Sequence, residues 1–203
     1  MYNSKESLDE WLRAACAGDE QAAEAIFRHF SPAVMRLSIS LLGDPRDADE
    51  VLQDTFVYAL RNLRRYDPGQ SAFQTWLFTI AISRCRNKRR RKWLPVIPLD
   101  RFLREEAPAA PHARSVEDWL AARGARQELW AAVQQLSPNL REALVLRYVG
   151  SLSYPEIGRA VGCGSRAAES RVRTAVAALR KRLAVDGSPA GGWRQALAEG
   201  GGQ

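Results

Sequence analysis

The densest group of chemically active side chains in this sequence is a run of cations. Seven of the nine residues from Arg84 to Lys92 are lysine or arginine. Like charges crowded on one helix repel each other unless an anion neutralises them. Aromatic residues precede the run at Tyr66, Phe73, Trp76 and Phe78. Aromatic rings beside a cationic groove are typical of surfaces that bind unstacked, single-stranded nucleic acid.

Each part of this group also has a simpler interpretation. Trp76 shares a helical face with Leu77 and Ile80, so we expect its ring to pack in a core. The ring of Phe73 fits either role. A solvated helix end is the alternative for the cationic run, and seven charges disfavour it.

A second group lies on a helix predicted from Ser165 to about Val185. A short helix and a Gly-containing turn precede it, which is the helix-turn-helix pattern. One face carries an apolar stripe of Ala168, Val172, Ala175, Leu179 and Leu183. The opposite face carries Arg166, Ala167, Ser170, Thr174, Ala177 and Lys181, flanked by Arg171 and Arg173. This face is a candidate reader of base edges in a major groove, with Arg180 to Arg182 placed for phosphates. A helical hairpin with a solvated basic face is the alternative.

A third group is acidic. Asp47, Asp49, Glu50, Gln53 and Asp54 cluster on the outer side of the first turns of one predicted helix. The helix dipole favours acids at this position, which is the plain explanation. An acidic patch on a basic protein repels DNA, however, and fits a basic protein partner.

Helical periodicity dominates the elements that must position these groups. Helices are predicted at about 8–16, 19–30, 31–42, 47–63, 72–91, 116–135, 138–150, 153–161 and 165–185. Ser31-Pro32 is expected to end one helix and start the next. We therefore predict an all-α fold. Two small helical domains, at 1–93 and 116–186, are joined by a flexible Pro-rich linker at 94–115 and followed by a disordered tail at 187–203.

Composition narrows the function classes. Lys and Arg number 30 against 23 Asp and Glu, which favours polyanionic partners. The three cysteines form no C-x-x-C pair and His29 and His112 are isolated, so we expect no disulfide framework, no metal and no cofactor. We find no nucleophile–base pair and no phosphate-cradling loop, so we expect no enzyme. The start of the chain lacks a signal peptide and no long apolar run is present, so a cytoplasmic protein without membrane insertion is expected.

Three stretches resemble the extracytoplasmic-function sigma factors, a group of the sigma-70 family. DADEVLQDTFVYAL and YDPGQSAFQTWLFTIAISRCRNKRRR are similar to region 2 of that family. LSPNLREALVLRYVGSLSYPEIGRAVGCGSRAAESRVRTAVAALRKRL is similar to region 4. The matches follow in the right order with a linker between them and cover most of residues 20–185. The resemblance implies a sigma factor that directs core RNA polymerase to promoters, helps melt the DNA and is held by an anti-sigma factor.

The resemblance also implies residue roles. Docking on the clamp helices of polymerase falls to Asp49, Glu50, Gln53 and Asp54, and the flap of the large subunits is a further partner surface. A flipped base of the minus-ten element would be captured by the loop of Tyr66, Asp67, Gln70, Ser71, Phe73 and Gln74. Further contacts to that element would come from Ser83, Arg84, Asn87, Lys88, Arg90 and Arg91. The minus-thirty-five element would be read by Arg166, Ala167, Ser170, Arg171, Arg173, Thr174 and Lys181.

Two departures from the family pattern bear on promoter choice. Ser83 stands where the family often has Asn, and Arg166-Ala167-Ala168-Glu169 replaces the frequent Gly-Thr-Val-Lys. A stand-alone helix-turn-helix regulator remains an alternative function, and so does an RNA-binding or RNA-modifying protein that uses the cationic run. The acidic patch and the aromatic-plus-basic helix disfavour the first, because a simple repressor needs neither.

Overall fold

The computed structural model describes residues 4–93 and 127–185, and every regular element in those ranges is helical. The N-terminal half contains α1 (Ser4–Cys16), α2 (Glu20–Leu42), α3 (Pro45–Arg61), the short η1 (Leu63–Arg65) and α4 (Phe73–Trp93). The C-terminal half contains a helical segment at 127–134 and then α6 (Pro138–Tyr148), α7 (Tyr154–Val161) and α8 (Ser165–Val185). The all-α prediction is confirmed. The predicted linker and tail lie outside the described residues.

Local capping sets where the first long helices begin. The carboxylate of Asp19 accepts a hydrogen bond from the Gln21 backbone N–H at 2.8 Å, and Asp44 accepts one from the Arg46 backbone N–H at 2.9 Å. These bonds satisfy amides that have no partner inside the helix. Gly43 ends α2 with a φ of +72°, which glycine adopts without strain. The predicted cap at Asp19 and the predicted turn after α2 are both confirmed.

The predicted break at Ser31-Pro32 is wrong, because α2 continues through Pro32 without interruption. Proline removes one backbone hydrogen bond from a helix interior, a cost of about 3 kcal/mol. Buried side chains on both sides of the proline hold the helix together: Ile26 and Phe30 before it, Val34 and Leu37 after it. Tertiary packing thus outweighs the local signal.

The C-terminal half forms the predicted helix-turn-helix. Ser153 and Glu156 make the predicted capping box, in which the Ser153 backbone N–H donates to the Glu156 carboxylate at 2.9 Å. Gly158 brings α7 close to the turn before α8. A Cβ atom at Gly158 would lie 2.5 Å from the carbonyl oxygen of Cys163, so only glycine permits this approach.

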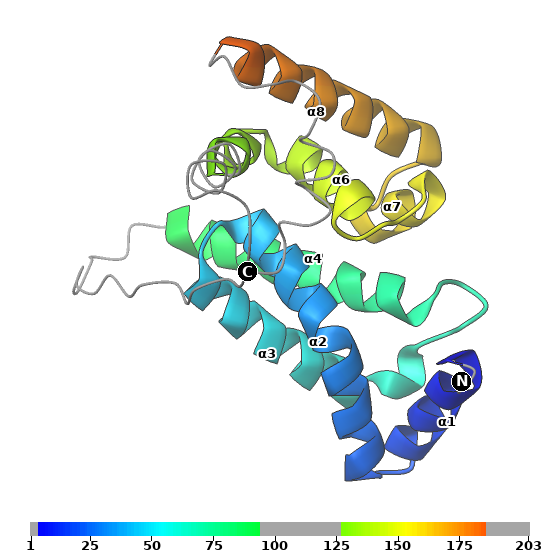
Figure 1. The fold of residues 1–203 in the computed structure, drawn as a ribbon. Helices are drawn as coiled ribbons and strands as arrows, with labels where there is room; N and C mark the ends of the chain where they lie inside the picture. The colour runs from blue at the N-terminus through cyan, green and yellow to red at the C-terminus, as the bar shows by residue number, and fades with distance from the viewer. Residues whose placement is uncertain (1–3, 94–126, 186–203) are drawn as a thin grey trace, which may run out of the picture.

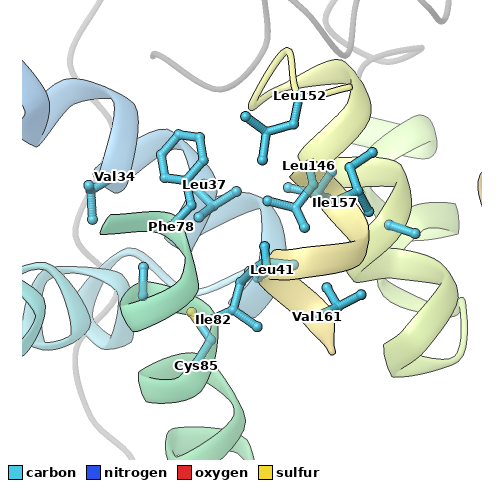
Figure 2. Packing of buried hydrophobic residues seen from close by; sticks show 14 of the residues in the cluster. Val34, Leu37, Leu41, Phe78, Ile82, Cys85, Leu146, Leu152, Ile157 and Val161 are labelled. Carbon is cyan, nitrogen blue, oxygen red and sulfur yellow. The ribbon is translucent and has the colours of Figure 1, made fainter. Parts of the chain in front are cut away.

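The two halves pack against each other through a shared apolar core. Helices α6 and α7 lie between α8 and the N-terminal helices α2 and α4 (Figure 1). Figure 2 shows Leu37 and Phe78 of the N-terminal half facing Leu146 and Ile157 of the C-terminal half. Gly150 adds to the fit, because a Cβ atom there would come within 3.0 Å of the Phe78 ring. The contact between the halves was not foreseen from the sequence.

Candidate nucleic-acid interface

The outer face of α8 is exposed as predicted. Its apolar stripe is buried in full, at Ala168, Val172, Ala175, Leu179 and Leu183. Its other face is exposed at Arg166, Ala167, Ser170, Arg173, Thr174 and Lys181. Arg171 is half-buried at the edge of that face. A helix with this division presents one polar, cationic surface about one major groove wide.

The loop between η1 and α4 is held in shape by its own side chains. The Tyr66 hydroxyl donates to the Ser71 carbonyl at 3.1 Å, and burial raises the pKa of this phenol. Asp67 accepts from the side chain of Gln70 at 2.9 Å and from the Gly69 backbone N–H at 2.8 Å. The hydrogen bond from Gln70 is the main reason that the pKa of Asp67 is lowered. The loop is therefore preorganised, with Asp67 and Gln70 at its exposed surface.

The aromatic residues near this loop form a packed cluster. Phe73 is 2% exposed and packs edge-to-face on Phe30 and Tyr66, with ring centroids 5.1 Å apart in both pairs. Trp76 is half-buried, and its ring lies 5.6 Å from the rings of Tyr66 and Phe73. The ring of Phe73 is covered in this arrangement, so it supports the loop from beneath. Gln74 is also only half-exposed.

The predicted minus-ten residues on α4 differ in their surroundings. Ser83, Arg90 and Arg91 are exposed, and Asn87 is half-buried. The guanidinium of Arg84 lies 4.9 Å from the ring centroid of Tyr58 on α3, a cation–π contact. These side chains form a surface open to an incoming strand.

Lys88 forms ion pairs with acids of the same chain. Its ammonium contacts the Glu50 carboxylate and lies 3.4 Å from the carboxylate of Asp47. The hydrogen bond to Glu50 is the main reason that the pKa of Lys88 is raised. Asp47 is 8% exposed, so its predicted place on the outer acidic face is wrong. The ammonium joins α4 to α3, and we assign Lys88 this bracing role.

Two cations of the run that the sequence did not single out make the most buried ion pairs. Arg86 and Arg89 both bind the carboxylate of Glu142 on α6, whose side chain is 1% exposed. The hydrogen bond from Arg86 to Glu142 is the main reason that the pKa of Arg86 is raised. A signal for Glu142 was available in the sequence. It is a lone acid beside the apolar run Ala143–Leu146. Such a run predicts a helix buried on all sides, and a buried carboxylate needs a cationic partner.

The residues predicted to dock on polymerase all lie at the surface of α3. Asp49, Glu50, Gln53 and Asp54 are exposed, and Gln53 donates from its side chain to Asp49 at 2.8 Å. About one turn beyond Asp54 on the same helix, Val57 and Tyr58 are large apolar side chains with exposed fractions of 51% and 36%. An acidic rim beside exposed apolar groups is suited to a protein partner.

The structure also bears on metal binding and on membrane insertion. Among the described residues, no group of three or more His, Cys, Asp or Glu side chains is arranged to hold a metal ion. Within residues 4–93 and 127–185, none of the helices has the length and apolar character needed to cross a bilayer.

The fold and these surfaces define an all-helical protein with a helix-turn-helix in one half and a cationic, loop-flanked helix in the other. The sigma-70 region 2 family matches residues 26–94, and the sigma-70 region 4 family matches residues 126–179. The chain is 32% identical to the RNA polymerase sigma factor CarQ of Myxococcus xanthus, over 82% of this chain and 91% of that protein. It is 30% identical to the RNA polymerase sigma-H factor of Pseudomonas aeruginosa, over 82% and 88% of the two chains.

Solved structures show the same fold. CnrH, solved in complex with the cytosolic domain of CnrY, superimposes with a TM-score of 0.63 at 24% identity, over 89% of this chain and 99% of that one. The sigma factor RpoE of Bartonella quintana, solved with the anti-sigma factor NepR, gives a TM-score of 0.62 at 24% identity, over 80% and 97%. The chain belongs to the extracytoplasmic-function group of the sigma-70 family.

Proposed function

We propose that this chain is the promoter-specificity subunit of a bacterial RNA polymerase holoenzyme, which it joins to start transcription. The observation that carries the proposal is the tandem of a region 2 and a region 4 match, each of which coincides with one of the two surfaces described above. Residues 1–93 would serve docking and the minus-ten element, and residues 116–186 would serve the minus-thirty-five element.

The two surfaces suit different forms of DNA. The exposed face of α8 would enter the major groove and read a duplex element through Arg166, Ser170, Arg171 and Thr174. The preorganised loop at 66–72 would hold a base flipped out of the melted element. Extruding a base costs a few kcal/mol, which stacking and phosphate neutralisation would offset.

The acidic face of α3 would bind polymerase. Its exposed carboxylates would meet the clamp helices, and Val57 and Tyr58 would add apolar contact area. Because the DNA-binding surfaces are cationic and the docking face carries exposed acids and apolar side chains, an anti-sigma factor that covers these surfaces is the expected regulator. With these partners, the chain would act in the cytoplasm.

The decisive experiment is run-off transcription by core polymerase on a promoter library, with and without the purified chain. We expect defined transcripts only when the chain is present. A chain that never co-purifies with core polymerase, or transcripts that do not depend on it, would contradict the proposed function. High affinity for structured RNA without polymerase would favour the RNA-binding alternative.

A double charge reversal tests the docking face. Asp49→Lys with Asp54→Lys should weaken the affinity for core polymerase roughly tenfold or more, because like charges would then face each other. Both side chains are exposed, so thermal unfolding should be almost unchanged. Glu24→Lys, which alters an exposed acid on α2, is the matched control. Equal affinity of the double variant and the control in a pull-down would remove the docking role.

A further inference from the structure

Glu142 binds two arginines of the cationic run with both of its carboxylate oxygens. The Arg86 guanidinium donates from Nε at 3.1 Å and from Nη2 at 2.6 Å, one bond to each oxygen. Arg89 donates from Nη2 to Oε1 at 2.8 Å. The pair of arginines thus forms a forked set of three donors that converges on one anion.

This arrangement fits a phosphate as well as it fits a carboxylate. The planar guanidinium fork recognises both anions in the same two-pronged manner. Two guanidiniums surround one carboxylate here, so the pair keeps an excess positive charge. In addition, Nη1 of Arg89 is buried and has no acceptor among the described residues, which leaves one donor beyond those that Glu142 satisfies.

The fork lies on the same two turns of α4 as the proposed minus-ten residues, on the side that faces α6. Arg84 and Lys88 face α3 instead, and the exposed Arg90, which the family resemblance assigns to the minus-ten element, directly follows Arg89. A strand bound along this helix must carry its phosphates past the same turns. In the structure, Glu142 of the other half occupies that place.

Two further contacts hold the C-terminal half over the same surface. Thr75 of α4 donates its hydroxyl proton to the Glu156 carboxylate at 3.2 Å. The guanidinium of Arg159 on α7 donates to the carbonyl oxygen of Gln70 at 2.6 Å, within the loop that would hold the flipped base. Leu146 and Ile157 add the apolar contact with Phe78 described above (Figure 2).

This closed arrangement is too short to bridge a promoter. Two elements centred about 25 base pairs apart are separated by roughly 85 Å of duplex, at about 3.4 Å per base pair. Helix α7 touches α4 directly, and α8 follows α7 after a short turn. A 21-residue helix such as α8 is only about 31 Å long. The two halves must therefore separate before both elements can be held at once.

We propose that Arg86 and Arg89 form a binding site for a backbone phosphate of the melted strand, and that Glu142 fills this site in the free protein as an internal competitor. The proposal rests on the proposed function, which supplies the DNA strand. Opening the two halves withdraws the carboxylate and frees the fork for DNA. The same pair of arginines stabilises the closed form and then binds the open promoter.

Glu142→Gln tests the proposal on the full-length chain without polymerase. The variant keeps the shape of the side chain but leaves two arginines without a counter-charge, a penalty that opening relieves. Small-angle scattering should show a larger radius of gyration than wild type, with helicity unchanged by circular dichroism. Affinity for a mixed-sequence single strand of about 15 nucleotides should rise roughly tenfold, because the competing closed population is lost.

A second variant separates the two parts of the proposal. Arg86→Gln with Arg89→Gln removes the same ion pairs from the surface of α4, so it should expand the chain to the same extent without the gain in DNA affinity. Glu128→Gln changes an exposed acid in the same half and is the matched control.

Each outcome has a definite meaning. Unchanged radii in both variants would overturn the competitor role of Glu142. Equal DNA affinity of the two expanded variants would overturn the phosphate site. Because neither measurement contains polymerase, a failure here is distinct from a failure of the transcription assay, which tests the proposed function alone.

Discussion

Helices α4 and α8 have the same length and similar charge, yet they differ in how many of their cations are free to bind a ligand. Both span 21 residues and are rich in lysine and arginine. On α8 the reading face is exposed to solvent. On α4 three of the cations bind acids from α3 and α6, and a fourth stacks on a tyrosine ring. A cationic sequence therefore does not by itself define an available surface, because the chain's own acids can occupy it.

The largest effect is expected from a variant that disables α8 and leaves α4 intact. Gly158→Ala places a Cβ atom 2.5 Å from the Cys163 carbonyl oxygen, which would force the helix-turn-helix apart. We expect a loss of about 1–3 kcal/mol in unfolding free energy and loss of duplex binding, with single-strand binding preserved. Urea unfolding and binding titrations on the two kinds of DNA measure this. Gly164→Ala is the control, since a Cβ atom there meets nothing within 4 Å and should change little.

The reading face itself can be tested one residue at a time. Arg171→Ala should cost about 1–3 kcal/mol of binding to the preferred minus-thirty-five duplex if the guanidinium makes a two-pronged contact with a base. Arg180→Ala, on an exposed cation nearer the end of α8, should weaken all duplexes alike. Competition titrations with preferred and scrambled duplexes separate the two cases. The same loss on both sequences for Arg171→Ala would show that it contacts only phosphate.

Within α4, one paired and one exposed cation should respond differently to substitution. Arg90→Met should reduce the salt dependence of single-strand binding by about one counterion, without a change in stability. Lys88→Met should leave the salt dependence unchanged. It should lower the free energy of unfolding by up to about 1 kcal/mol, because Lys88 joins α4 to acids of α3. Salt titrations and urea unfolding give both quantities. An equal drop in salt dependence for Lys88→Met would mean that its ammonium also reaches DNA.

The smallest expected effect concerns the cap of α7, which also contacts α4. Hydrogen bonding from Ser153 is the main cause that lowers the pKa of Glu156 below its ordinary value of 4.5. The folded state thus favours the carboxylate, and this stabilisation is present above the unfolded pKa and lost as pH falls through the folded pKa. The free energy of unfolding of the wild type should exceed that of Glu156→Gln by less than about 0.5 kcal/mol at neutral pH.

That difference should begin to shrink below about pH 4.5, where the unfolded chain takes up a proton at Glu156, and should be lost as the pH falls through the lower pKa of the folded state. Urea unfolding of both proteins across the acid range measures it. Glu24→Gln, at an exposed acid of α2 outside any cap, is the control. A gap between wild type and Glu156→Gln that widened on acidification would contradict the assignment.

The sequence predicts what depends on neighbours along the chain. The two faces of α8, the cap at Asp19 and the capping box at Ser153 follow from helical period and local hydrogen bonding, and the structure confirms them. Together with the family resemblance, these features were enough for the all-α class and for the candidate surfaces.

The rest depends on contacts between residues distant in sequence, which periodicity does not encode. The local sequence predicts that a helix starts at Pro32, but buried side chains on both sides of the proline keep α2 continuous. Asp47 reads as an outer acid, but its partner Lys88 is 41 positions away on another helix. Glu142 pairs with arginines more than 50 positions away, across the boundary between the two halves. These contacts decide which cations of α4 are available.

The three thiols of the chain make the contact between halves measurable without engineering. Cys85 is fully buried, and burial raises the pKa of its thiol to about 12, so it stays protonated and closed to reagents in the folded protein. Cys16 on α1 and Cys163 beside α8 are partly exposed, one in each half. A thiol-reactive dye pair would therefore attach at these two natural positions and report their separation by energy transfer, from the free protein through to the open promoter complex.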